Sequence, residues 1–250
     1  MKKLLAGCLC LFLAACNVPT ATPVAPLFPT ATFSPTPVPV TVTPASTPTP
    51  PAPQFTATPF PRFFSDEFDD ASLTGWVILQ AGNDAVPNVK TENSTLILEM
   101  DSPYTWAYAL YGAQDYEDIR IEAQFANQAG SPASIGLICR YSETDGWFEY
   151  NVSTDGTYNV LRGKWLASGI ADYVPVVNGS SSAIRPSGTA QQIGLTCSGT
   201  TLSFSIDQNI IRNIDISRYK VSAGKAGIAA ASFENTPIIA AFDWVKVSAP

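Results

Sequence analysis

The 250 residues of this chain contain no histidine. The side chains that could do chemistry are therefore its carboxylates, aromatic rings and cysteines. Without an imidazole there is no Ser-His-Asp or Cys-His catalysis and no histidine-ligated zinc. The 21 acidic residues outnumber the 14 basic ones, which gives a net charge of −7. A chain this acidic lacks the basic surface that nucleic acids require, so we expect no nucleic-acid partner.

Trp and Tyr side chains are concentrated between residues 104 and 165 and could stack on sugar rings. Sugars present C–H faces to aromatic rings, and their hydroxyl groups take hydrogen bonds from polar side chains. Arg140 could supply such bonds, because strand parity places it on a sheet surface if Cys139 points into the core. The alternative is that half of the rings are simply core. The predicted ligand-binding residues are Arg140, Trp106, Tyr108, Trp147, Tyr150 and Tyr158, and Trp165 belongs to the same aromatic group.

The elements that must position these residues are β-strands. Apolar and polar residues alternate over residues 119–125 and again over residues 201–206, which is typical of strands with one face on a core. Turn signals separate such segments, at Asp145-Gly146, Asp155-Gly156, Ser198-Gly199 and Asp207-Gln208-Asn209. The sequence predicts an all-β fold, a two-sheet antiparallel β-sandwich of roughly a dozen strands.

Residues 1–16 have the features of an export signal: two lysines, a short apolar run and then Cys16. The run is shorter than the roughly 20 residues that span a bilayer as a helix. Leu13-Ala14-Ala15-Cys16 resembles the lipobox of bacterial lipoprotein signal peptides, in which the cysteine thiol receives diacylglycerol. We therefore expect an extracytoplasmic protein of the bacterial cell envelope, anchored to a membrane through lipid on Cys16. An ordinary secretory signal with an incidental cysteine is the alternative.

Residues 17–62 are rich in proline and threonine, with 14 prolines and 11 threonines. Proline removes backbone donors and restricts the preceding residue, so this segment is predicted to be a disordered, extended linker. Residues 63–250 are then expected to form one folded domain.

The cysteines are consistent with export. Cys8 and Cys10 leave with the signal peptide and Cys16 is lipidated, so Cys139 and Cys197 remain. A pair of cysteines in an oxidising compartment most often bonds, and we predict a Cys139–Cys197 disulfide. Two buried free thiols are the alternative.

The motifs of residues 63–250 occur in an order that resembles a known family. Residues 64–68, FSDEF, together with Trp76, are similar to the opening of concanavalin A-like lectin/glucanase jelly rolls. Further matching segments are residues 136–141, 147–150, 155–158, 224–228 and 241–245. Their order is similar to bacterial envelope domains related to laminin-G and to the 3-keto-disaccharide hydrolase family. The resemblance implies a jelly roll with a concave face that often binds carbohydrate, although this fold serves many functions.

Hydrolysis of a glycan is the alternative to binding. Laminarinase-like jelly rolls carry a Glu-x-Asp-x-(x)-Glu strand that points its carboxylates into one cleft. Residues 67–72 have a serine where the third acid belongs, and an Asp-Gly turn interrupts residues 143–149. That turn should splay Glu143 away from Glu149. Glu149 remains the one candidate for catalysis outside the motif, and otherwise it is a solvated strand acid.

A structural Ca²⁺ ion is the only cofactor that we consider. Asp66, Asp69 and Asp243 lie near the two ends of the domain, which often meet in jelly rolls, and carboxylate oxygens suit Ca²⁺. The resemblance also implies such an ion, and ordinary surface acids are the alternative.

These features predict a surface-anchored lipoprotein with a lectin-like domain that binds a glycan or other extracellular polymer without hydrolysing it. A glycoside-hydrolase-like enzyme and a structural envelope or adhesion spacer are the alternatives.

Overall fold

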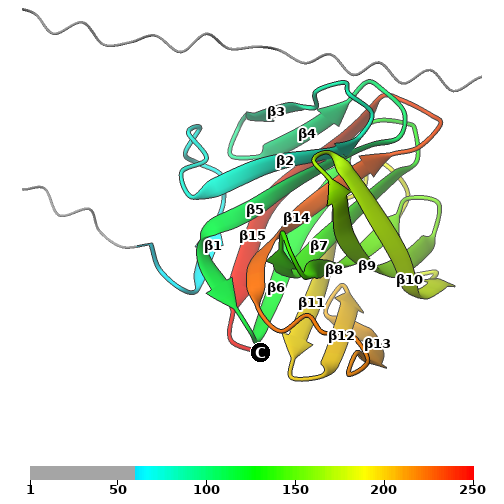
Figure 1. The fold of residues 1–250 in the computed structure, drawn as a ribbon. Helices are drawn as coiled ribbons and strands as arrows, with labels where there is room; N and C mark the ends of the chain where they lie inside the picture. The colour runs from blue at the N-terminus through cyan, green and yellow to red at the C-terminus, as the bar shows by residue number, and fades with distance from the viewer. Residues whose placement is uncertain (1–59) are drawn as a thin grey trace, which may run out of the picture. The chain divides into compact units, whose positions relative to one another are not determined.

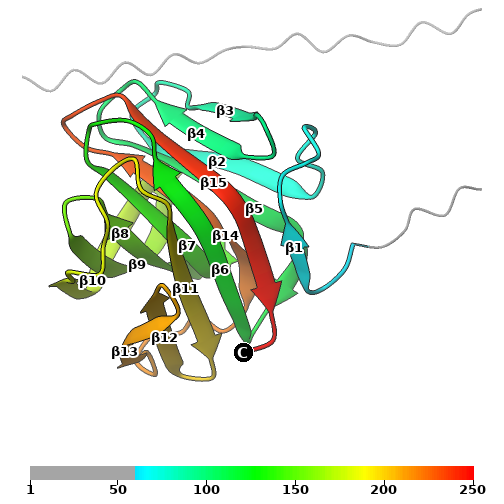
Figure 2. The same cartoon turned by 180° about the vertical axis from the view of Figure 1, so that it is seen from behind.

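The structure is a computed structural model that describes residues 60–250, so the predicted signal peptide, Cys16 and nearly all of the predicted linker lie outside the described residues. The described part of the chain contains fifteen β-strands and no helix, arranged as two antiparallel sheets that pack face to face (Figures 1 and 2). Within this part, no helix is long and apolar enough to cross a membrane. The predicted all-β sandwich is therefore confirmed.

One sheet has eight strands. They are β1 (Phe64–Asp66), β3 (Asn88–Thr91), β4 (Leu96–Met100), β6 (Ile119–Asn127), β11 (Gln191–Ser198), β12 (Thr201–Ile206), β13 (Asn209–Asp215) and β15 (Ile238–Ser248). Their order is β13-β12-β11-β6-β15-β4-β3, and β1 pairs with β15 beyond the end of β4.

The other sheet has seven strands. They are β2 (Trp76–Gly82), β5 (Thr105–Tyr116), β7 (Ala133–Ser142), β8 (Gly146–Ser153), β9 (Thr157–Ala167), β10 (Ile170–Ser180) and β14 (Gly224–Ser232). Their order is β10-β9-β8-β7-β14-β5-β2, so β10 and β2 are its two edges.

The main core lies between the two sheets. In β6 every second residue from Ile119 to Asn127 is buried, as the alternation predicted. The inward residues of β12 and β11 are buried in the same way. Burial of apolar area at about 25 cal/mol per Å² makes this core the main source of stability.

A disulfide crosses the core and joins the two sheets. Cys139 of β7 and Cys197 of β11 are fully buried and bonded, with their Cα atoms 6.6 Å apart. The predicted pairing is therefore present in the structure.

The seven-stranded sheet curls until its two edges meet. The β9–β10 hairpin stands in front of the sheet with its turn beside β2 (Figure 1), and Gly82 N donates a hydrogen bond of 3.0 Å to the carbonyl of Gly169 in that turn. The outer face of this sheet is thus concave, and the hairpin covers part of it.

Candidate functional site

The concave face of the seven-stranded sheet is filled by a second apolar core. This second core contains residues from all seven strands and is separate from the core between the sheets. Its buried members are Ala81, Tyr108, Leu110, Ile138, Tyr141, Trp147 and Ala229, and Leu79, Trp106, Trp165, Ala171 and Tyr173 pack against it while partly buried.

Trp147 lies at the centre of the second core and is fully buried. Its ring centroid is 5.3 Å from those of Tyr141 and Trp165 and 5.9 Å from that of Tyr108. On the neighbouring strand it pairs with Gly163, where a Cβ atom would come within 2.3 Å of the indole. Glycine is needed there because the ring lies against the backbone of β9.

Of the predicted ligand-binding aromatics, three belong to the second core. Trp106 and Tyr108 share the concave face with Trp147, but Tyr108 and Trp147 are buried. Trp106 is partly buried and stacks on Tyr173 of the covering hairpin, with centroids 5.9 Å apart.

Tyr150 and Tyr158 lie on the opposite face, in the core between the sheets. Both rings pack on Phe204 of the eight-stranded sheet, with centroids 4.6 and 5.3 Å away. The Tyr150 hydroxyl is buried and has no hydrogen-bond partner among the described residues. These two tyrosines therefore do not share a surface with the concave-face aromatics.

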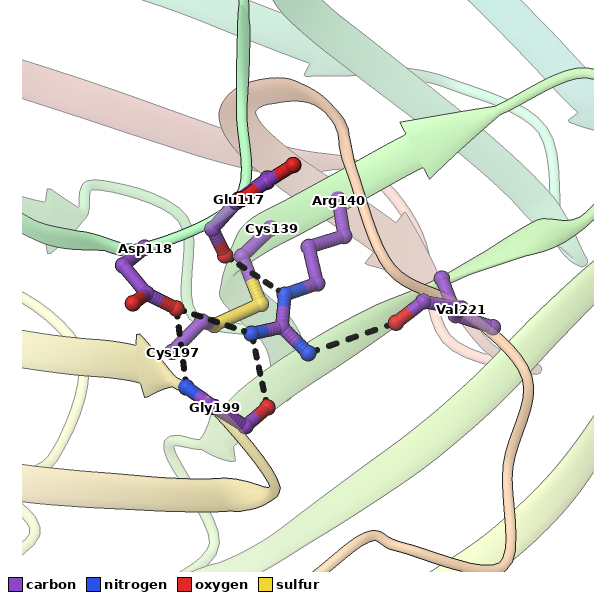
Figure 3. Close-up of a disulfide and its surroundings, with 7 residues drawn as sticks. All are labelled: Glu117, Asp118, Cys139, Arg140, Cys197, Gly199 and Val221. Carbon is purple, nitrogen blue, oxygen red and sulfur yellow. Dashed lines mark hydrogen bonds and ion pairs between the residues drawn. A yellow bond between two sulfur atoms is a disulfide. The ribbon is translucent and has the colours of Figure 1, made fainter.

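Arg140 is also separated from the aromatic rings, and the expectation that it points out from the sheet is wrong. A β-bulge between Cys139 and Ser142 gives Arg140 a φ of 54°, which breaks the alternation of the strand. Its side chain is buried beside the disulfide (Figure 3).

The Arg140 guanidinium forms hydrogen bonds with three segments that connect strands. It donates to the carbonyls of Glu117 at 2.7 Å, Val221 at 3.3 Å and Gly199 at 2.8 Å, and to the Asp118 carboxylate at 3.2 Å (Figure 3). A buried guanidinium that donates to three backbone carbonyls stabilises the fold, because a buried carbonyl without a hydrogen bond costs free energy. A cavity of about 470 Å³ borders this cluster, but its lining contains none of the concave-face aromatics.

Glu149 is buried in the second core and is not a solvated strand acid. Its two carboxylate oxygens accept hydrogen bonds from Trp147 Nε1 at 3.0 Å and from Asn151 Nδ2 at 2.9 Å. Burial raises the pKa of the carboxyl, and these two hydrogen bonds oppose the rise.

The buried carboxyl makes stability depend on pH. Because its pKa is raised in the folded state, the folded protein holds this proton more tightly than the unfolded chain, and the free energy of unfolding falls as pH rises through the interval between the two pKa values. Glu149→Gln removes this contribution. We expect the stability of wild type relative to Glu149→Gln to decrease with rising pH in denaturant titrations.

Glu143→Gln is the matched control for this prediction, since Glu143 is exposed. Its pH profile should follow that of wild type. A wild-type profile parallel to that of Glu149→Gln at every pH would contradict the burial of a titrating group at residue 149.

The acids of the predicted calcium site have separate partners. Asp66 accepts hydrogen bonds from Phe68 N and from Trp76 Nε1, at 2.8 and 2.7 Å. Asp69 and Asp243 are bound by other side chains, those of Ser94 and Gln124. Within residues 60–250, no three Cys, Asp or Glu side chains are grouped as metal ligands would be.

An open cleft lies at the rim of the second core and has a volume of about 560 Å³. One wall is Ile78, Leu79 and Gln80 of β2, and the others come from the end of β7 and the turn after it, the end of β9 and the β9–β10 turn. The remaining lining residues are Tyr141, Glu143, Trp165, Leu166, Ala167, Ser168 and Gly169. Of the second core, Leu79, Tyr141 and Trp165 line this cleft.

The two aromatic rings of the cleft, Trp165 and Tyr141, are fixed by contacts with each other and with the second core. Trp165 Nε1 donates a hydrogen bond of 2.8 Å to the Tyr141 hydroxyl, and Trp147 packs against both rings. Leu166 on the hairpin is 69% exposed and Ile78 on β2 is 39% exposed. The cleft therefore combines fixed aromatic rings with exposed apolar edges, which suits stacking on a flat ligand.

Sequence reasoning included Trp165 among the aromatics but missed Tyr141, Glu143 and Gln80 as site residues. Tyr141 lies at the end of β7 and Glu143 in the turn that follows, two residues further on, and no sequence pattern marks this pair as a site. Gln80 carried no signal, because its part in the cleft depends on the hairpin reaching β2.

Comparison with known proteins yields the fold. No family model matches the chain, and no curated protein matches it. Among solved structures, a protein of unknown function with a galectin-like fold from Bacillus subtilis has a TM-score of 0.54 at 12% identity, covering 74% of this chain and 94% of that one. A native glycosidic hydrolase has a TM-score of 0.53 at 14% identity, covering 78% and 100%. The carbohydrate-binding module CBM66 from Bacillus subtilis has a TM-score of 0.50 at 14% identity, covering 68% and 92%.

These likenesses, at low identity, are likenesses of fold. Together with the two-sheet topology they confirm the concanavalin A-like jelly roll that the motif order indicated.

Proposed function

We propose that residues 63–250 form a non-catalytic domain that binds a glycan or other extracellular polymer in the cleft between β2, β7 and the β9–β10 turn. The observation that carries this proposal is the aromatic cleft itself, with Trp165 and Tyr141 held in place by the second core. Ligand sites typically combine apolar and aromatic walls with a few polar groups, and a cleft of about 560 Å³ has the usual size. Structural neighbours include a carbohydrate-binding module and a glycosidic hydrolase, which agrees with a sugar ligand.

Binding without hydrolysis is favoured by the state of Glu149. The carboxyl is enclosed by the second core, and its oxygens are engaged by Trp147 and Asn151. A glycosidase needs two carboxyl groups flanking the scissile bond. Glu143 lines the cleft, whereas Glu149 is buried behind it, so the two carboxyls do not face one bound sugar.

A spacer without a ligand is the second candidate, and the burial of Trp147 favours it. A face that is filled by its own side chains needs no ligand. The two functions differ in one respect that can be measured: only the binding function requires Trp165 for something other than stability.

For the location, we propose a lipid anchor on Cys16 followed by an extended Pro/Thr-rich tether, on the outer side of a bacterial membrane. Support comes from the sequence of residues 1–62. A multi-chain anchor holds a protein at the membrane because each buried CH₂ group contributes about 0.8 kcal/mol.

A glycan-array scan of the full chain in mild detergent tests the binding function. Wild type should give defined hits, and Trp165→Ala should weaken them by about tenfold or more, because stacking on an aromatic ring is lost. Phe233→Ala is the matched control, since Phe233 is 40% exposed and lies outside the cleft. Hits that survive Trp165→Ala would contradict the cleft as the site, and an array without hits would favour the spacer.

A further inference from the structure

The charges of the cleft indicate which class of polymer it takes. Within the described part of the chain, Glu143 is the one charged residue among those that line the cleft. Its side chain is exposed and belongs to no ion pair within residues 60–250. A ligand in this cleft therefore meets a negative charge that has no protein partner.

The negative charge lies close to the aromatic rings. Burial raises the pKa of the Tyr141 phenol, the hydrogen bond from Trp165 opposes this rise, and the charge of Glu143 adds to it. Aromatic faces attract cations, and a nearby carboxylate adds a Coulomb attraction for the same cation. Tyr141, Trp165 and Glu143 together have the composition of a site for a positively charged nitrogen.

The other polar groups of the cleft are consistent with a ligand that donates hydrogen bonds. Gln80 uses its amide Nε2 for the carbonyls of Asn83 and Ala85, at 2.6 and 2.8 Å. What Gln80 can offer a ligand is therefore its carbonyl oxygen, an acceptor.

A second cavity adjoins the cleft. It has a volume of about 270 Å³, shares Tyr141 and Glu143 with the cleft and extends toward Asp115 and Lys225. The Lys225 ammonium is engaged by the Gly112 carbonyl at 3.0 Å and by Asp115 at 3.3 Å, so it is already paired. Two adjoining cavities around one carboxylate fit consecutive units of a chain better than a single monosaccharide.

We infer that the cleft recognises a glycan whose units carry free, protonated amino groups, in preference to neutral, N-acetylated or acidic glycans. This inference rests on the proposed polymer-binding function and specifies its ligand. The net charge of the chain acts in the same direction, since an acidic protein attracts a cationic polymer and repels an anionic one.

The test is a binding titration of the full chain in mild detergent with three oligosaccharides of equal length. The probes are a β-linked glucosamine oligomer, its fully N-acetylated counterpart and a galacturonate oligomer, at a pH where the amines are protonated. The amino form should bind about tenfold more tightly than the N-acetylated form, because the cation contacts both rings and the carboxylate.

Glu143→Gln is expected to weaken binding of the amino form about fivefold and to leave the N-acetylated form unchanged. Glu67→Gln is the control: it removes the same charge from an exposed position outside the cleft and should change nothing. Equal weakening by both variants would mean that the net charge of the molecule attracts the polymer, which would overturn the inference.

The inference and the proposed function fail in different ways. If the N-acetylated or the acidic oligomer binds as tightly as the amino form, and Trp165→Ala abolishes that binding, the polymer-binding function stands and the amino-sugar inference is overturned. If no oligomer depends on Trp165, both are overturned. If a lysine oligomer binds as tightly as the amino sugar and also requires Glu143, the ligand is a cationic peptide and the assignment to a glycan is wrong.

Discussion

Trp147→Ala should lower the free energy of unfolding by about 3–5 kcal/mol, as is usual when a large buried aromatic side chain is removed. The ring is fully buried, lies against Gly163 and has four aromatic neighbours. Its removal would also take one hydrogen bond from the buried Glu149 carboxyl. Urea titrations followed by far-ultraviolet circular dichroism would measure the loss.

Trp165→Ala is the matched control for this prediction. The two rings touch, but Trp165 is partly exposed and lines the cleft, so its removal should cost clearly less stability. If Trp147→Ala instead cost less than about 1 kcal/mol, as typical surface substitutions do, the concave face would be an open surface and not a second core.

Removing the disulfide is the second large effect. Cys139 and Cys197 are separated by 58 residues in sequence. Closing a loop of that length contributes on the order of 4 kcal/mol in the chain-entropy model. The Cys139→Ala/Cys197→Ala double variant should therefore be less stable by about that amount, with its unfolding midpoint at correspondingly lower urea.

Reduced wild type provides the control and should unfold near the midpoint of the double variant. The pairing itself can be checked by mass after alkylation of the unfolded, unreduced protein. Uptake of label at both Cys139 and Cys197 would contradict the disulfide.

The fold could be predicted from the sequence because its causes are local. Alternation over residues 119–125 reports one buried face of β6, and turn pairs such as Asp155-Gly156 mark the points where the chain reverses. The disulfide could also be predicted, since only Cys139 and Cys197 remain once the predicted signal segment is set aside.

The site could be predicted only in part, because it depends on contacts between distant segments. Trp147 and Glu149 are two residues apart on one strand, so parity places them on the same face. The burial of both follows from the β9–β10 hairpin folding over the sheet, and no local pattern shows this. Arg140 was placed on the wrong surface because a bulge shifted it out of the alternation. A bulge inserts a residue without leaving a reliable mark in the sequence.

Ligand should enter through the cleft beside Trp165 while the second core stays closed. The most direct measurement is a titration of the full chain with the best array ligand, followed by the indole N–H signals of its five tryptophans. The Trp165 signal, assigned by its loss in Trp165→Ala, should shift, and that of Trp76 in the core between the sheets should stay in place. A bound ligand that leaves the Trp165 signal unmoved would contradict binding in this cleft.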